Sequence, residues 1–352
     1  MKIDFTKKLL KWDREQNFRS MPWKKEASPY RIWLSEIILQ QTRVEQGMGY
    51  YKKFLSAFPT IKALANAPEK EIFKCWEGLG YYSRCRNLIA AAKKIVADHQ
   101  GRFPSSYADI RALPGIGPYT AAAISSFAFG QPYAVVDGNV IRVLARYFGI
   151  NTPPGSSAGK KLFDVLAGEL LDKNQPAAYN QAIMDFGATI CKPRRPLCSA
   201  CIQLKSCQAF QNGWTNELPS KQTALVRRKR WFYYFIVEAD KNKYWVRKRT
   251  GKDIWQNLYE FVLWEPGKFI PQDRIGENAF FQDHFGNQGL QIRQISSPVQ
   301  QFLTHQSITG CFVHLSHTLT KFPGYQAVSK KQLQAFPFPK MIAEYIASLP
   351  PL

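Results

Sequence analysis

Four of the seven cysteines gather in one short stretch of the sequence, at Cys191, Cys198, Cys201 and Cys207. Four thiolates within 17 residues can wrap one compact cofactor, and four cysteines are what a [4Fe-4S] cluster requires. Structural zinc sites usually take cysteines as two close pairs, and here only Cys198 and Cys201 are so paired. The spacing therefore favours one [4Fe-4S] cluster, with zinc as the alternative.

A glycine-rich string, LPGIGPY at residues 113–119, stands between two helical patterns. Gly115 and Gly117 allow a tight turn with exposed backbone N–H groups, and Pro118 suits the first turn of the following helix. N–H groups at a helix N-terminus bind anions such as DNA phosphate. An ordinary helix turn is the alternative, which the whole string in a basic chain disfavours.

Glu36 lies in a helical pattern over residues 31–41, for which Ser28 and Pro29 offer a cap and a first turn. Its neighbours on that helix are mostly apolar, among them Ile32 and Trp33. Partial desolvation would raise the pKa of the carboxyl, so that it holds a proton near neutral pH and can act as a general acid. The alternative is a glutamate at the rim of a core helix that reaches water.

Asp137 precedes another helical pattern, where aspartate is a common N-cap. A functional interpretation also exists, because glycoside hydrolysis needs one acid and one anion that faces the developing positive charge on the sugar. Glu36 and Asp137 could form that pair, although 101 residues of sequence separate them.

The overall composition indicates a polyanionic partner. The 352 residues are enough for two domains, and 48 Lys and Arg against 26 Asp and Glu give a net charge of +22. Nucleic acid is the first candidate and an anionic membrane surface the rival. No apolar run approaches the ~18 residues that span a bilayer, and residues 1–16 contain no signal core, so we expect a cytoplasmic protein without membrane association.

The pattern of apolar residues divides the chain into two parts. Residues 1–210 indicate helices joined by short turns, and the clearest cover 31–41, 50–57, 71–76, 87–97, 119–129 and 140–148. Residues 211–228 suggest a linker. The basic run at 227–230 indicates a solvated edge, with contact to phosphate as the alternative. Residues 229–352 predict an α/β domain with strands near 231–238, 243–248, 258–264 and 311–315, a hairpin turn at 239–242 and a closing helix at 340–348.

Taken in order over residues 15–210, these motifs resemble the MutY-type adenine DNA glycosylases of the helix–hairpin–helix superfamily, which includes endonuclease III. The resemblance rests on Leu34-Ser35-Glu36, on the stretch from Leu39 to Thr42, on GLGYY at 78–82, on the 113–119 hairpin, on VDGNV at 136–140 and on the cysteine spacing. It implies a multidomain α and α+β fold, with an all-helical catalytic domain (1–210) that carries the cluster loop (191–207).

The resemblance implies removal of adenine mispaired with 8-oxoguanine or guanine in double-stranded DNA, by a monomer. Glu36 would protonate the leaving adenine, Asp137 would stabilise or trap the sugar cation, and Tyr119 and Asn139 would orient the site. Tyr119 stands where bifunctional relatives place a lysine that forms a Schiff base, so we expect no strong strand cleavage. The adenine pocket would be lined by Arg19, Met21, Trp23, Lys24, Leu39, Gln181 and Met184. Gln41, Thr42, Leu79 and Tyr81 would wedge the duplex while the base is flipped out.

The C-terminal part, 229–352, resembles the MutT-like (Nudix-like) domain that such enzymes use to recognise 8-oxoguanine. Ser316 and His317 match its recognition loop, although Leu315 stands where phenylalanine is common. Two alternatives stay open: a related glycosylase with another preference, such as thymine opposite guanine, and a non-catalytic DNA-binding protein in which Glu36 and Asp137 are surface and cap residues.

Overall fold

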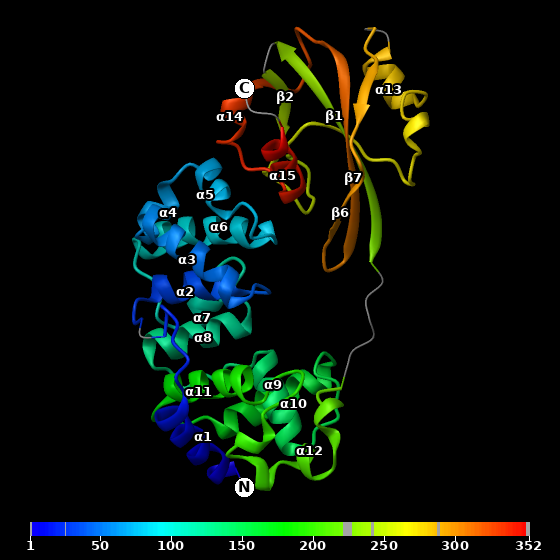
Figure 1. Ribbon diagram of the computed structural model, residues 1–352. Helices are drawn as coiled ribbons and strands as arrows, with labels where there is room; N and C mark the ends of the chain where they lie inside the picture. Colours follow the sequence, from blue (N-terminus) through cyan, green and yellow to red (C-terminus); the bar gives the residue numbers. More distant parts are fainter. Residues whose placement is uncertain (1, 25, 221–226, 241–242, 287–288, 350–352) are drawn as a thin grey trace. The chain divides into compact units, whose positions relative to one another are not determined.

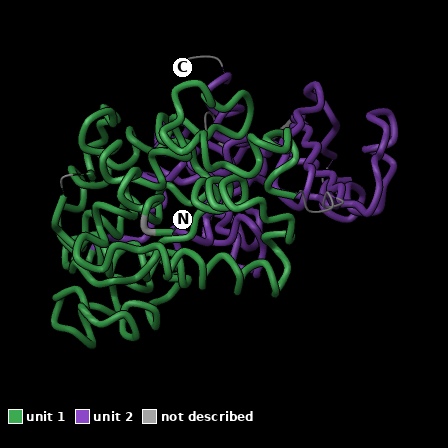
Figure 2. The backbone as a smooth tube through the Cα atoms, turned by 90° about the horizontal axis from the view of Figure 1, so that it is seen from below, with its two compact units in different colours: residues 1–66, 87–223 green, residues 67–86, 224–352 purple. Residues whose placement is uncertain are grey.

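The computed structural model describes residues 2–24, 26–220, 227–240, 243–286 and 289–349. They form two compact units, residues 1–66 with 87–223 and residues 67–86 with 224–352 (Figure 2). The predicted domain boundaries differ from these units, because residues 67–86 pack with the C-terminal residues and the first unit extends to residue 223. In the predicted linker, Leu218 is buried in the core of the first unit, and residues 221–226 lie outside the described part of the chain.

The first unit is helical, as predicted (Figure 1). Its helices include α1 (Lys2–Gln16), α2 (Pro29–Leu39), α3 (Val44–Ala57), α4 (Ile61–Asn66), α7 (Tyr107–Arg111), α8 (Pro118–Phe129), α9 (Gly138–Phe148), α10 (Ser157–Leu170), α11 (Pro176–Thr189) and α12 (Gln208–Gln211), with α6 (Tyr82–His99) spanning residues of both units. One core cluster packs Phe5 and Trp12 of α1 against Phe186 of α11. α11 also packs on α8 and α9, so the residues that begin those two helices are brought to one side of it.

Two helix starts bear on the site. Pro29 occupies the first turn of α2, as predicted, but Ser28 makes no side-chain capping bond and only its backbone oxygen accepts from the N–H of Ile32. The Ser28 hydroxyl was therefore wrongly predicted to cap the helix. Pro118 begins α8, and Gly130 ends it in the left-handed conformation that favours glycine.

The second unit has the predicted α/β character. Its strands are β1 (Arg228–Asp240), β2 (Lys243–Lys248), β3 (Tyr259–Glu260), β4 (Val262–Trp264), β5 (Ile292–Ile295), β6 (Val299–Phe302), β7 (Gln306–Thr318) and β8 (Gln326–Ser329), and its helices include α5 (Glu69–Trp76), α13 (Ala279–His284), α14 (Lys330–Leu333) and α15 (Lys340–Ser348). β1 runs parallel to β7 and antiparallel to β2 and β4. The predicted hairpin of β1 and β2 is present, while Lys241 and Asn242 of its turn lie outside the described residues.

Both faces of β1 are buried. Phe235 packs on Phe285, which follows α13, with ring centroids 5.0 Å apart, and on the opposite face Phe312 of β7 stacks on Tyr345 of α15 at 3.7 Å. A helix thus covers each face of the sheet, which explains the continuous aromatic run of β1. Within the described ranges, every helix is too short or too polar to cross a membrane.

Candidate active site

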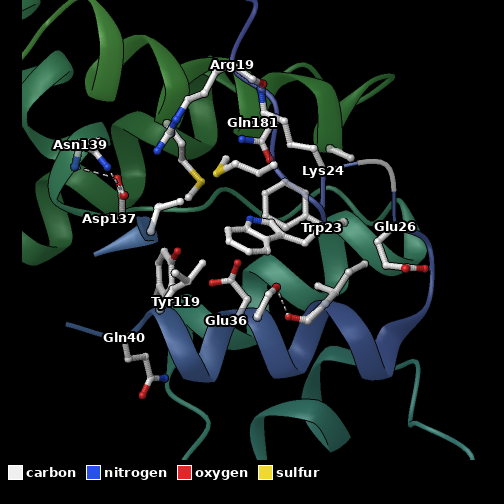
Figure 3. Close-up of a pocket in the computed structure, with 18 of the residues that line it drawn as sticks. Arg19, Trp23, Lys24, Glu26, Glu36, Gln40, Tyr119, Asp137, Asn139 and Gln181 are labelled. Carbon is white, nitrogen blue, oxygen red and sulfur yellow. Dashed lines mark hydrogen bonds between the residues drawn. The ribbon is translucent and has the colours of Figure 1, made fainter. Parts of the chain in front are cut away.

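A cavity of about 900 Å³ opens in the first unit, between the segment that follows α1, the inner face of α2 and the starts of α8, α9 and α11 (Figure 3). The four residues predicted to do the chemistry, Glu36, Asp137, Tyr119 and Asn139, all line it. So do the predicted base-contacting and wedging residues Arg19, Met21, Trp23, Lys24, Leu39, Gln41, Thr42, Gln181 and Met184. The fold therefore joins residues from five separate stretches of the sequence in one hollow.

The burial of Glu36 follows from its helix. α2 buries nearly every residue from Tyr30 to Ile38, and Glu36 is 8% exposed. Burial raises the pKa of its carboxyl to about 7; the nearby charge of Asp137 adds to the rise, and a hydrogen bond with Tyr119 opposes it. Glu36 therefore holds a proton for a substantial fraction of the time at neutral pH, rather than reaching water from the rim.

Asp137 is both the helix cap and a wall of the cavity. It is the N-cap of α9, and its Oδ1 accepts from the backbone N–H groups of Asn139, at 2.8 Å, and Val140, at 2.7 Å. Burial raises the pKa of Asp137, although hydrogen bonds from Val140 and Asn139 oppose the rise. The two interpretations of this residue are compatible, because capping uses one carboxylate oxygen while the other meets a side chain at the cavity.

That side chain is Asn139, whose Nδ2 donates to Asp137 Oδ2 at 2.7 Å (Figure 3). Its carbonyl oxygen accepts from Arg142 Nη2 at 2.8 Å, which also donates to the backbone oxygen of Gly187 at 2.7 Å. A side chain at Gly187 would collide here, because a Cβ atom would lie 2.7 Å from Asn139 Cβ. The bare backbone of α11 thus lets Asn139 approach and hold the Asp137 carboxylate.

Tyr119 is the second residue of α8 and the last residue of the predicted hairpin. Figure 3 shows its hydroxyl and the Glu36 carboxyl pointing into the same space, with Asp137 across from them. Burial, together with the charges of Glu36 and Asp137, raises the pKa of Tyr119 well above its ordinary value, so it stays neutral. In the hairpin itself, Gly115 has a φ of +75°, and a Cβ there would lie 2.5 Å from Asn87 Cβ.

The hairpin glycines Gly115 and Gly117 and four other predicted residues are not among those that line the cavity. In the second unit, Leu79 is buried, whereas Tyr81 is 43% exposed and its hydroxyl lies 2.7 Å from Thr304 Oγ1. Ser316, in β7, accepts from the backbone N–H of Gln291 at 3.0 Å. The side chain of His317 lies outside the described part of the structure.

Sequence reasoning missed two residues that the structure places beside predicted ones. Thr304 meets Tyr81 across 223 residues of sequence, and Asp185 pairs with Arg19 and Lys24. Asp185 lies four residues after Gln181, on the same face of α11, so helical spacing from a predicted site residue is a signal that could have found it.

The four clustered cysteines line a second, small hollow of the first unit, together with Arg146. All four are free thiols, and Arg146 Nη1 lies 3.5 Å from Cys191 Sγ. Within the described residues, no three His, Cys, Asp or Glu side chains converge closely enough for a single metal ion. The four cysteines nevertheless line one hollow, and four thiolate donors are what a [4Fe-4S] cluster requires.

Comparison with known proteins identifies the family. Residues 34–167 match the HhH-GPD superfamily of base excision DNA repair proteins, and residues 233–348 match the NUDIX domain. The protein named adenine DNA glycosylase from Buchnera aphidicola subsp. Schizaphis graminum is 36% identical over 261 residues, which are 73% of this chain and 74% of that protein. The chain belongs to the adenine DNA glycosylase family. The predicted resemblance to MutY-type glycosylases, the fold class and the assignment as a DNA glycosylase enzyme are thereby confirmed.

Other members and more distant structures fit this placement. The adenine DNA glycosylase of Homo sapiens is 42% identical over 216 residues, which are 59% of this chain and 39% of that longer protein. A solved thermostable thymine-DNA glycosylase is 32% identical, with a TM-score of 0.56, and covers 60% of this chain and 97% of its own. An endonuclease III–DNA complex, 19% identical with a TM-score of 0.53, shares the fold.

Proposed function

We propose that this chain removes adenine mispaired with 8-oxoguanine or guanine in duplex DNA, by hydrolysing the N-glycosidic bond, and that it does not break the strand efficiently. The observation that carries the proposal is the meeting of Glu36 and Asp137 in one cavity, with burial raising the pKa of Glu36 to about 7. The family name of the curated relatives supports adenine as the base.

The chemistry follows from the two carboxyl groups. Protonated Glu36 would donate its proton to a nitrogen of the adenine, so that the base leaves as a neutral molecule. The bond electrons leave with the base, and the positive charge that develops on the sugar would be stabilised by the Asp137 carboxylate. Water would then add to the sugar cation and lose one proton, which the Glu36 carboxylate would take back. Tyr119 cannot form a Schiff base with the sugar, which supports base removal alone.

The remaining predicted residues have proposed roles in holding the DNA. Arg19, Trp23 and Gln181 would contact the extruded adenine in the cavity, and the hairpin glycines would present N–H groups to phosphate. Opposite the adenine, the contacts would come from Gln41, Thr42, Leu79 and Tyr81, and Ser316 and His317 would read 8-oxoguanine. In this proposal, residues 1–210 are the catalytic domain, 211–228 a linker and 229–352 the domain that reads the opposite base.

We also propose that Cys191, Cys198, Cys201 and Cys207 hold one [4Fe-4S] cluster, since all four line one hollow. Such a cluster supplies a rigid cross-link for the loop. Arg142 donates to the backbone oxygen of Cys191 at 2.7 Å, so that loop is tied to the helix whose N-cap is Asp137. Iron analysis and visible absorbance of the purified protein test this assignment against zinc.

The deciding experiment is single-turnover base release from defined duplexes. We compare three duplexes, with adenine opposite 8-oxoguanine, adenine opposite guanine and thymine opposite guanine. Gels run before and after alkali treatment then detect strand breaks. We expect release of adenine from the first two, with strand breaks only after alkali. Release of thymine instead would favour the second candidate, which the solved thymine-DNA glycosylase relative supports, and base release from none of the duplexes would overturn the proposal.

A further inference from the structure

A buried carboxylate outside the predicted site joins two walls of the active-site cavity. Asp185 lies on α11 and has no exposed surface. Gln181, one turn earlier on the same helix, lines the cavity. Residues 17–24, which follow α1 and form neither helix nor strand, supply Arg19 and Lys24 to another wall of it.

Three donors from that segment converge on the single carboxylate. Asp185 Oδ1 accepts from Arg19 Nη1 at 2.7 Å, and Oδ2 accepts from Asn17 Nδ2 at 2.9 Å. The ammonium group of Lys24 forms an ion pair with Oδ2 and also donates to the backbone oxygen of Arg19. A segment without regular structure is thus fixed at one point of α11 by charged hydrogen bonds, which are stronger than neutral ones.

The Asp185 carboxylate is buried, so it and its donors depend on one another. The side chains of Arg19 and Lys24 are 27% and 15% exposed, and that of Asp185 is 0% exposed. A carboxylate in that position is stable only while its donors stay in place, and the two cations would move toward water without it. The side-chain positions of Arg19 and Lys24 in the cavity wall therefore depend on Asp185.

We propose that Asp185 is a positioning residue for base recognition. It holds Arg19 and Lys24 at a fixed separation from Gln181, and so sets the width of the space that the extruded base enters, while not itself lining the cavity. The inference rests on the proposed function, since the base is taken to be adenine held in this cavity. The residue acts on binding of the base rather than on the proton transfer from Glu36.

The test measures affinity for two duplexes that differ only in the base. One carries a 2′-fluoro adenine nucleotide that resists cleavage, opposite 8-oxoguanine, and the other carries a tetrahydrofuran abasic-site analogue at that position. Asp185→Asn keeps the shape of the side chain and removes its charge. We expect roughly tenfold weaker binding of the adenine duplex, the size of a lost charged hydrogen bond, and binding of the abasic duplex unchanged within about twofold.

Two controls separate positioning from general damage. Asp164→Asn makes the same chemical change at an exposed position of α10 and should leave both affinities unchanged. Arg19→Gln should weaken binding of the adenine duplex by itself, and the double variant with Asp185→Asn should be no worse than the weaker single variant, because both changes disable one wall.

Each outcome decides the inference. Equal losses on the two duplexes, fully additive effects of the two substitutions, or unchanged affinity in Asp185→Asn would overturn it. The enzyme without substitutions serves as the reference for the proposed function. If it releases no adenine, the proposed function and this inference fail together; if it releases adenine while Asp185→Asn binds both duplexes normally, this inference alone fails.

Discussion

The two carboxyl groups of the cavity come from regions that offer a negative charge different numbers of hydrogen-bond donors. Around Glu36, a buried face of α2 supplies little but apolar side chains, with the Tyr119 hydroxyl to oppose the rise in pKa. Around Asp137, two backbone N–H groups and the Asn139 amide converge on the carboxylate. Burial raises both pKa values, but three hydrogen bonds oppose the rise at Asp137 and only one opposes it at Glu36. In the proposed reaction, this difference suits Glu36 to donate a proton and Asp137 to stabilise a positive charge.

Removing each carboxyl group in turn gives the largest expected effects. Glu36→Gln should slow single-turnover adenine release by roughly 10²–10⁴-fold, the usual contribution of a general acid. Asp137→Asn should slow it by roughly 10²–10³-fold through loss of charge stabilisation, while asparagine still caps α9. DNA binding, measured by fluorescence anisotropy, should survive in both.

Glu26→Gln is the matched control for that comparison. Glu26 lines the same cavity, but hydrogen bonds from Arg31 and the backbone of Ser28 outweigh the effect of burial and lower the pKa of its carboxyl. It is therefore ionised at neutral pH and cannot donate a proton. If Glu26→Gln slowed adenine release as much as Glu36→Gln does, the raised pKa of Glu36 would not be what distinguishes the proton donor.

The same environment should make the wild-type protein less stable than Glu36→Gln at high pH. The pKa of Glu36 is about 7 in the folded chain against 4.5 as the ordinary value. The titration of Glu36 therefore leaves the free energy of unfolding unchanged below pH 4.5 and lowers it as the pH rises through 7. The full difference is about 3 kcal/mol, from 1.36 kcal/mol per pKa unit. Thermal unfolding at pH 4.5 and pH 8.5 measures it, and an equal melting temperature of the two proteins at pH 8.5 would contradict it.

The smallest expected effect is a shift in the pH profile of single-turnover adenine release, which tests the titration of the two carboxyl groups separately. Above about pH 7 the rate should fall tenfold per pH unit as Glu36 loses its proton. At low pH the rate should fall as Asp137 becomes protonated. Asn139→Ala removes a donor to the Asp137 carboxylate and raises the pKa of Asp137, so this fall should begin at a higher pH. If the high-pH limb moved as well, the two carboxyl groups would not be independently tuned.

Sequence reasoning succeeded where the signal was local. The apolar neighbours of Glu36 on one helix predicted its burial, and the position of Asp137 before a helical pattern predicted its cap. The fold class was predictable for the same reason, since helical spacing and aromatic strand runs are short-range patterns. The roles of Ser316 and His317 stay predictions.

Contacts between distant side chains were out of reach. Arg230 stands in a charge run expected to be solvated, yet the structure buries it, with Nε 2.7 Å from Glu265 and Nη1 2.9 Å from Asp253. Its partners follow 23 and 35 residues later, with no spacing rule to connect them. Thr304 escaped for the same reason, because a single polar pair leaves no periodic trace in a sequence, whereas helical spacing from Gln181 offered a signal for Asp185.

Gly187 shows how far the demands of catalysis extend beyond the reacting groups. It carries no functional group, yet any side chain at its α-carbon would push Asn139, and with it the Asp137 carboxylate that Asn139 holds. A saturation library of this enzyme should therefore accept glycine alone at position 187, as strictly as it accepts glutamate at position 36. Surveys that rank positions by the chemistry of their side chains would overlook a residue whose contribution is empty space.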